Sequence, residues 1–363
     1  MIPNLFPSLA MNRLFLFLLV IVVSFPLSDT TTAGECHAQQ APNFPIAHDT
    51  LRLLTIGNSY SLDATVCLPQ LLNDAGVDNR QFAVYCAMEG GASLEYWRDQ
   101  LRNKRKVDNL YHMGGMLKLP ERDWTLEELL GQPWDVIVLQ QASKLSDHFA
   151  NYVPHAEELL EAIHRLCPNK AVRVAWHMTW SHAIFFDNGP YSKKGWEDIA
   201  AATRRLCETH NFSLLIPSGT AIQNMRNLYP DDLRAFTRDG THIVYGMGNY
   251  LLALTWFETI CSPIFGISLI GVPPSQKVCD INADKTPLCD INSANYPIAH
   301  YCVWQAIHNP YELVSTIRNK SVNSLLHYSG GLPTVPIYDL SGRPVTGRPG
   351  KGIFIMGNKK MVF

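Results

Sequence analysis

Three residues of this sequence have the types and spacing that nucleophilic catalysis requires: Ser59, Asp239 and His242. A serine hydroxyl is a poor nucleophile at neutral pH unless an imidazole accepts its proton. The imidazole in turn needs a carboxylate that fixes its tautomer. Asp239 precedes His242 by three residues in the turn-like segment 238–242, so its carboxylate can reach the ring locally. An Asp-Gly turn beside a surface histidine is the structural alternative.

Ser59 lies in the segment 57–61, Gly-Asn-Ser-Tyr-Ser, directly after the apolar run 51–56. A glycine after a buried strand permits a tight turn, which can expose the serine hydroxyl at the carboxyl end of that strand. The backbone N–H groups that follow then point at the same place and can stabilise an oxyanion. Gly-Asn-Ser is also a common turn that carries no chemistry.

Two more polar segments follow apolar runs. Segment 89–94, Glu-Gly-Gly-Ala-Ser-Leu, contains Gly91, which lets a backbone N–H approach a substrate oxygen closely. Gln140 and Gln141 end the next apolar run, and their side-chain amides can donate to an oxyanion. A flexible loop and plain polar caps are the structural alternatives for these two segments.

The elements that position these residues alternate between strands and helices. Apolar runs predict strands, and apolar residues at helical spacing predict helices. The predicted strands are 51–56, 82–87, 135–140, 171–176 and 212–216, and the predicted helices are 66–75, 154–166, 194–209 and 245–260. This alternation indicates an α/β fold with a parallel sheet and right-handed crossovers. In such sheets the active residues follow the carboxyl ends of the strands.

In these blocks the chain resembles the SGNH (GDSL-type) hydrolases over residues 50–262, and within them a branch known only as a domain of unknown function in secreted proteins. The resemblance implies a three-layer, doubly wound parallel sheet of the flavodoxin-like kind, and an esterase that needs no metal or organic cofactor. It implies Ser59 as nucleophile and oxyanion donor and the Gly91 N–H as second donor. His242 is the implied base and Asp239 its orienting partner.

The third block departs from the usual Gly-x-Asn-Asp of these hydrolases. The SGNH-type carbohydrate acetylesterases have a Gln-Gly-Glu-Ser block instead, which Gln141-Ala142-Ser143 resembles. Gln141 is therefore the expected third oxyanion donor, with Gln140 as the alternative. The candidate substrate-binding residues are Gln140 and, after the fourth strand, His177 and Trp180; packing in the core is the alternative for the tryptophan.

The expected function is thus an exported serine esterase that removes acetyl or other short acyl groups from a carbohydrate through an acyl-Ser59 intermediate. Two alternatives remain open: a lipase or lysophospholipase with the same triad, and a non-catalytic carbohydrate-binding protein that retains the fold. The net charge of −2 gives no basic surface of the kind that nucleic acids require. The histidines and cysteines lack the spacing of a zinc site. The sequence indicates no oligomeric state.

The N-terminus predicts export to the periplasm, the cell surface or the medium. A basic start at Met11-Asn12-Arg13 precedes the apolar run 14–27, and small and polar residues follow up to Ala38. This is the pattern of a signal peptide, here 1–38. The run is shorter than the roughly 20 apolar residues of a membrane span. Cys36 offers the alternative of a lipid-modified cysteine, although Glu35 before it fits poorly.

The remaining segments are a linker (39–49), an extension that packs on the core (263–334) and a small β tail (335–363). The tail resembles a C-terminal segment found in many secreted Gram-negative proteins. Export permits disulfides, and the first expected pair is Cys279 with Cys289, which share one loop-like stretch. The cysteines on apolar faces are expected to be small buried hydrophobes. They are Cys86, Cys167 and Cys207.

Overall fold

The structure is a computed structural model. It describes residues 49–183, 193–228, 236–275, 279 and 288–314, with the backbone of three short strands near the C-terminus. All of them belong to one compact unit, Ala33–Phe363. The expected signal peptide, nearly all of the expected linker and most of the expected β tail lie outside the described residues.

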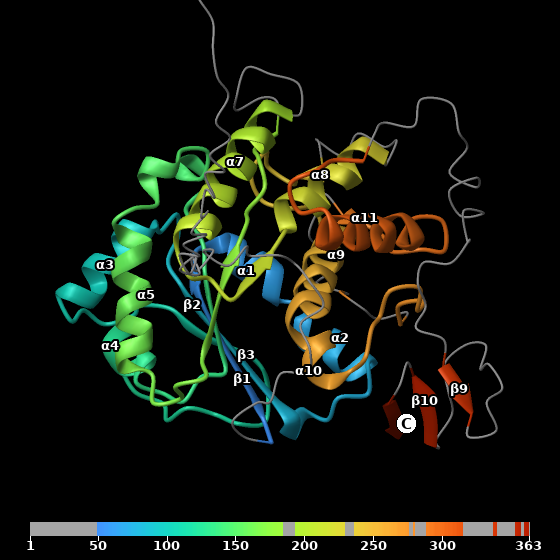
Figure 1. The fold of residues 1–363 in the computed structure, drawn as a ribbon, viewed down its shortest axis with the longest axis horizontal. Coiled ribbons are helices and arrows are strands. Elements are labelled where there is room, and N and C mark those ends of the chain that lie inside the picture. The colour runs from blue at the N-terminus through green and yellow to red at the C-terminus, as the bar shows by residue number, and fades with distance from the viewer. Residues whose placement is uncertain are drawn as a thin grey trace, which may run out of the picture. The chain divides into compact units, whose positions relative to one another are not determined.

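A six-stranded sheet of order β3-β2-β1-β4-β5-β6 forms the centre of the fold (Figure 1). Its strands are β1 (Leu51–Gly57), β2 (Phe82–Met88), β3 (Leu110–Gly115), β4 (Val136–Leu139), β5 (Arg173–His177) and β6 (Leu214–Ile216). Five strands pair in parallel, and only the edge strand β3 runs antiparallel, against β2. In chain order the parallel strands follow the 2-1-3-4-5 arrangement of flavodoxin-like sheets, whose order reverses beside β1.

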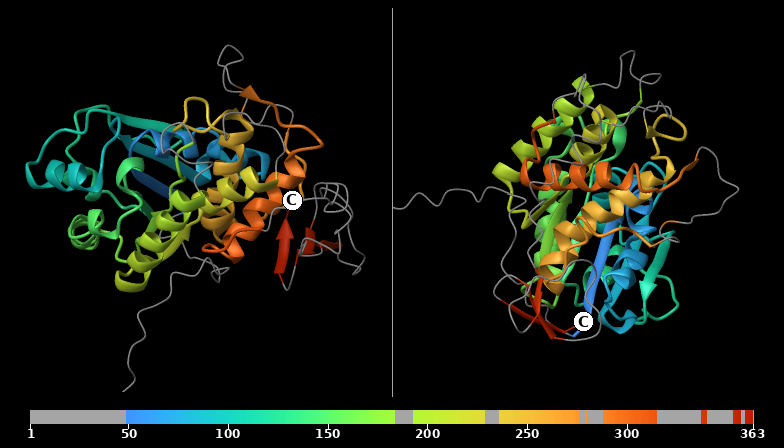
Figure 2. Two further views of the ribbon diagram at one scale, coloured as in Figure 1. Left: turned by 90° about the horizontal axis from the view of Figure 1, so that it is seen from above. Right: turned by 90° about the vertical axis from the view of Figure 1, so that its right-hand side faces the viewer.

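Helices cover both faces of the sheet. They are α1 (Ser59–Thr65), α2 (Leu68–Asp74), α3 (Leu94–Arg102), α4 (Leu126–Leu130), α5 (His155–Leu166), α7 (Lys193–Thr209), α8 (Ser218–Leu228), α9 (Met247–Trp256), α10 (Ser262–Phe265) and α11 (Tyr296–His308). One apolar core lies under α1, α2, α8, α9 and α11. The other lies under α3, α4, α5 and α7. Figures 1 and 2 show α3, α4 and α5 on one side of the strands and α2 and α9 on the other.

Shorter elements complete the described chain. They are the 3₁₀ turns η1 (Asn79–Gln81), η2 (Ser143–Leu145) and η3 (Phe149–Asn151), a π-helical turn η6 (Phe257–Cys261), and the two-residue parallel strands β7 (Tyr245–Gly246) and β8 (Leu288–Cys289). A separate antiparallel sheet contains β9 (Ile337–Asp339), β10 (Ile353–Met356) and β11 (Lys359–Val362). Helix α11, in the segment expected to pack back on the core, contacts α8 and α9.

Polar caps begin the helices that matter for the site. Asn58 precedes α1, and its side chain accepts a hydrogen bond from the Tyr60 N–H. Ser93 caps α3 in the same way, through the Tyr96 N–H. Such caps satisfy N–H groups that have no partner inside the helix. They fix where each helix starts, directly beyond the strands β1 and β2.

The sequence predicted a mixed α/β fold with a mostly parallel sheet, and the structure confirms it. Several elements were missed, among them β3, α1, α3 and α4. Strand β3 ends in two glycines and is half exposed, so it lacks the continuous apolar run of the buried strands. Helix α1 begins at Ser59 and has only seven residues, which is too short to show a helical period.

The expected disulfide between Cys279 and Cys289 is wrong. Cys279 is bonded instead to Cys67, with their Cα atoms 5.3 Å apart, and Cys289 is buried and takes no part in that bond. Pairing depends on the distance between Cα atoms in space rather than in sequence. Cys67 precedes α2 and therefore meets a segment 212 residues further along the chain. The prediction for Cys86, Cys167 and Cys207 is confirmed, because all three are buried in the core.

Candidate active site

Ser59, His242 and Asp239 lie together at the carboxyl end of β1. The Ser59 Oγ is 2.8 Å from the His242 Nε2, and the His242 Nδ1 is 2.6 Å from an Asp239 carboxylate oxygen. Ser59 is the first residue of α1 and is partly exposed. The structure thus brings Ser59 together with His242, which lies 183 residues further along the chain.

The segment that carries His242 is held by Asp239 itself. The second carboxylate oxygen of Asp239 accepts hydrogen bonds from the N–H groups of Thr241 and His242 and from the Thr241 hydroxyl. Partial burial acts to raise the pKa of Asp239, but these hydrogen bonds outweigh it and hold the pKa below its usual range. Asp239 is therefore a carboxylate at neutral pH, the form that accepts the Nδ1–H of His242.

The backbone N–H groups of Ser59 and Gly91 are the two expected oxyanion donors. Within the described part of the chain, neither the Ser59 N–H nor the Gly91 N–H has a hydrogen-bond acceptor. Gly91 has a φ of +68°, which glycine adopts readily, and the space where a Cβ would lie is open. The Asn58 side chain ties the two blocks together, because its Nδ2 donates to the Ala92 carbonyl at 3.0 Å.

The two glutamines point to opposite faces of the sheet. Along β4, Val136 and Val138 pack into the core on the α1 side, and Ile137 and Leu139 into the core on the α3 side. This alternation places Gln140 on the side of Ser59 and Gln141 on the other. The two side chains consequently have different partners.

The expected role of Gln141 as third oxyanion donor does not fit the structure. Its Oε1 accepts from the N–H groups of Leu94 and Ala142, and its Nε2 donates to the Asn151 carbonyl at 2.6 Å. No contact joins it to Ser59 among the described residues.

Gln140, the alternative, lies under the nucleophile turn. Its Nε2 donates to the Asn58 Oδ1 at 2.7 Å, and its Oε1 accepts from the Ser61 hydroxyl at 2.7 Å. A Cβ on Gly57 would collide with the Gln140 side chain, so the turn can sit against the glutamine only because residue 57 is glycine. The contacts of Gln140 are with residues on either side of Ser59, and they support the turn.

His177 and Trp180, the expected substrate-binding residues, are fully buried. The His177 Nδ1 is 3.0 Å from the Gln140 Oε1, and burial lowers the pKa of the ring to about 3. The Trp180 ring stacks on Tyr60 with centroids 3.9 Å apart and donates its indole N–H to the Thr241 carbonyl. Both side chains therefore support the site from inside the core, and the interpretation of them as a surface for sugars is wrong.

The sequence analysis missed Asn58, Ser61 and the ion pair of Asp63 with Arg238. Asp63 lies one turn after Ser59 on α1, and Arg238 directly precedes Asp239. Their closeness in sequence to Ser59 and to Asp239 was the signal that could have indicated a role in the site. A charged residue needs a partner when it is buried.

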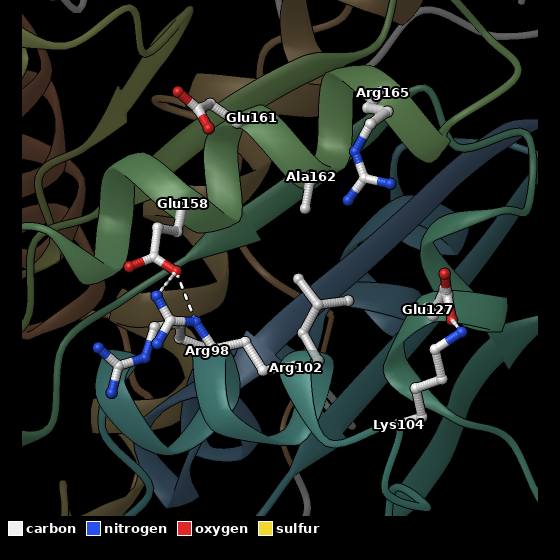
Figure 3. Close-up of a pocket in the computed structure, with 9 residues that line it drawn as sticks. Arg98, Arg102, Lys104, Glu127, Glu158, Glu161, Ala162 and Arg165 are labelled. Carbon is white, nitrogen blue, oxygen red and sulfur yellow. Dashed lines mark hydrogen bonds and ion pairs between the residues drawn. The ribbon is translucent and has the colours of Figure 1, made fainter.

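A hollow between α3, α4 and α5 is lined mainly by charged side chains (Figure 3). Arg102 pairs there with Glu158, and Lys104 with Glu127. None of the residues that line it is a candidate site residue.

The described residues contain no group of three or more potential metal ligands. The described helices include none that is long and apolar enough to cross a bilayer.

The fold and the site together define a class: a mostly parallel α/β protein with a Ser–His–Asp constellation where the strand order reverses. The chain belongs to the family described as a domain of unknown function (DUF4886), whose model matches residues 52–269.

A solved structure of a DUF4886 family protein from Bacteroides uniformis is similar to this chain. The two are 25% identical with a TM-score of 0.57, and the match covers 75% of this chain and 100% of that one. A Bacteroides fragilis protein provisionally named an acylhydrolase matches at 16% identity with a TM-score of 0.34, over 62% of this chain and 89% of that one. No curated protein matches the chain.

Proposed function

We propose that this protein is a serine ester hydrolase that works through an acyl-Ser59 intermediate. The observation that carries the proposal is the chain of short contacts from the Ser59 Oγ to the His242 Nε2, at 2.8 Å, and from the His242 Nδ1 to Asp239, at 2.6 Å. A serine, a base and an orienting carboxylate within hydrogen-bond reach are the geometric signature of an activated nucleophile.

The proposed mechanism has two half-reactions. The Asp239 carboxylate accepts the Nδ1–H, which leaves the Nε2 lone pair free to take the Ser59 proton as the Oγ attacks the ester carbonyl. The imidazolium then gives that proton to the leaving alcohol, and the acyl group stays on Ser59. A water molecule repeats the sequence and releases the acid and the free serine. The negative oxygen formed in both steps would lie against the Ser59 and Gly91 N–H groups.

The proposed substrate is a short acyl ester of a carbohydrate, acted on outside the cytoplasm. The N-terminal pattern of a basic start, an apolar run and small residues before Ala38 supports export. The resemblance of the third block to the acetylesterases supports the acyl group, although Gln141 itself faces away from Ser59. A lipase with the same triad and a non-catalytic binding protein are the outcomes that the tests below distinguish.

Ser59→Ala tests the nucleophile. We expect the purified variant to lose turnover of an activated acetyl ester while it keeps the melting temperature of the wild type. A fluorophosphonate probe should label the wild type at Ser59 and leave the variant unlabelled. Ser213→Ala is the matched control, because Ser213 is exposed at the opposite end of the sheet, just before β6. Equal rates for Ser59→Ala and wild type would refute the mechanism.

The acyl chain length separates the proposed substrate from its alternatives. Rates on esters from acetyl to decanoyl should fall with length, and acetylated sugars should be deacetylated. A maximum at medium or long chains would move the assignment to a lipase. A folded protein that neither reacts with the probe nor turns over any ester would be a binding protein.

A further inference from the structure

Asp63 and Arg238 form a buried ion pair beside the candidate site. The guanidinium donates to both carboxylate oxygens of Asp63, at 3.1 and 3.0 Å, in the two-pronged geometry of the strongest such pairs. The two side chains are only 8% and 17% exposed. The pair joins α1, which begins with the nucleophile, to the segment that carries the base.

Asp63 also holds the far end of that segment. The Ile243 N–H donates to the Asp63 Oδ2 at 3.3 Å, and the Ile243 carbonyl accepts from Arg238 at 2.6 Å. The Arg238 N–H donates to the His242 carbonyl at 2.9 Å, which closes segment 238–242 into a loop. One carboxylate therefore contacts the residue before Asp239 and the residue after His242.

Further contacts make the pair rigid. The Arg238 guanidinium lies 4.4 Å from the centre of the Tyr245 ring. On the other side, the Asn249 Nδ2 donates to the Asp63 backbone carbonyl at 2.9 Å, which links α1 to α9. These contacts fix both partners in place. The ion pair can therefore hold the segment 238–242 at a fixed distance from α1, in addition to neutralising charge.

Stability alone does not explain a buried pair at this place. Taking two charges out of water costs free energy that their attraction often fails to recover, and apolar replacements are frequently as stable. Burial raises the pKa of Asp63, while the hydrogen bonds and charge of Arg238 act in the opposite direction. What the pair does supply is a fixed distance between two segments that carry reacting groups.

We propose that Asp63 is a positioning residue, which acts through Arg238 and Ile243 to hold the His242 Nε2 against the Ser59 Oγ. This inference rests on the proposed function, since it assigns a role in the same reaction. Catalysis by a base needs its nitrogen within hydrogen-bond reach of the proton, and misplacement by about 1 Å costs on the order of 10²-fold in rate.

The test is Asp63→Asn, with rates normalised to the number of sites that a fluorophosphonate labels. Asparagine keeps the shape but places an NH₂ group against the guanidinium. We expect kcat per labelled site to fall roughly 10- to 100-fold, because His242 loses its fixed position. KM should stay within about twofold, because Asp63 does not face the substrate. The rate of fluorophosphonate labelling should fall with kcat.

Asp135→Asn is the matched control. Asp135 is also buried, at 5% exposure, and it accepts from the Arg52 N–H and the Asn169 side chain at the opposite end of the sheet. It should lower the melting temperature and leave kcat per labelled site unchanged. If Asp63→Asn behaves like this control, the role of Asp63 is structural and the inference is overturned.

Arg238→Lys gives the same test if Asp63→Asn does not fold. Lysine keeps the charge but cannot reproduce the two parallel hydrogen bonds, so kcat per labelled site should fall while KM holds. Wild-type kcat in this variant would contradict the inference. Absence of labelling at Ser59 in the wild-type protein would instead defeat the proposed function, so the two failures are distinguishable.

Discussion

The two ends of the central sheet bury polar groups in different ways. At the amino end, Asp135 accepts from the Arg52 N–H at 2.9 Å, and the Asn169 amide donates to the Trp134 carbonyl at 2.9 Å. These bonds close loops. At the carboxyl end, Asn58, Gln140 and Ser61 form a comparable network. That network lies beside the Ser59 hydroxyl, which contacts His242, whereas the Ser59 and Gly91 N–H groups have no acceptor among the described residues.

This difference shows where function can be sought in a fold of this kind. Buried polar groups are paired at both ends, as in most proteins, so their number does not separate structure from function. The carboxyl end differs from the amino end because its network fixes the position of a nucleophile and of two N–H donors but leaves the N–H donors without an acceptor in the described part of the chain. The predictions below test whether the carboxyl end alone carries the chemistry.

The largest expected effect is on the histidine and its carboxylate. His242→Ala should lower kcat by about 10⁶, as loss of the base does in serine proteases. Asp239→Asn should lower it by about 10⁴ or less, since the imidazole remains but its tautomer is no longer fixed. Stopped assays on an activated acetyl ester measure both. If Asp239→Asn lowered kcat no more than Asp135→Asn does, the two ends of the sheet would not differ in their contribution to catalysis.

The fold and the three central residues of the candidate site could be predicted from the sequence because each depends on a local sequence pattern. Ser59 follows a continuous apolar run, and Asp239 and His242 are three residues apart. Long-range contacts were not readable. The Cys67–Cys279 bond and the contact of Asp63 with Arg238 join residues about 200 positions apart, and neither shows in any local pattern.

The two glutamines show a third limit. Adjacent residues at a strand end differ only in the face they point to, and a slip of one position reverses that face. The sequence placed Gln141 beside Ser59, whereas the structure places Gln140 there. The alternation of the apolar residues of β4 between two cores decides the matter, and those cores are known only once the helices are placed.

A smaller effect is expected from exchanging these glutamines for alanine. Gln140→Ala removes one of the two donors to the Asn58 Oδ1 and the acceptor of the Ser61 hydroxyl, so kcat should fall about tenfold along with a loss of stability. Gln141→Ala strands the Leu94 and Ala142 N–H groups on the far face, so it should cost stability, about 1–3 kcal/mol, with a smaller change in kcat. Thermal melts and kcat per labelled site separate the two outcomes. A larger kinetic loss in Gln141→Ala would restore the donor role expected from the sequence.

The smallest effect concerns two buried histidines and appears only in acid. Burial lowers the pKa of both His177 and His300 to about 3, against about 6.5 in an unfolded chain. Above pH 6.5 both states are neutral and the rings add no pH dependence. As the pH falls from about 6.5 towards 3, only the unfolded chain binds the protons, so stability declines.

His177→Gln and His300→Gln should therefore each make the free energy of unfolding less dependent on pH in this window, by up to one proton per molecule. Urea melts at a series of pH values measure this slope.

The two variants should differ in turnover at neutral pH. His177 contacts Gln140 under the nucleophile turn. His300 lies on α11 and contacts Tyr250 and the Gly271 N–H, away from the candidate site residues. His177→Gln should thus lower kcat severalfold and His300→Gln should leave it unchanged. Equal effects on kcat would mean that the polar network around Ser59 is no more coupled to the chemistry than a buried histidine elsewhere in the core.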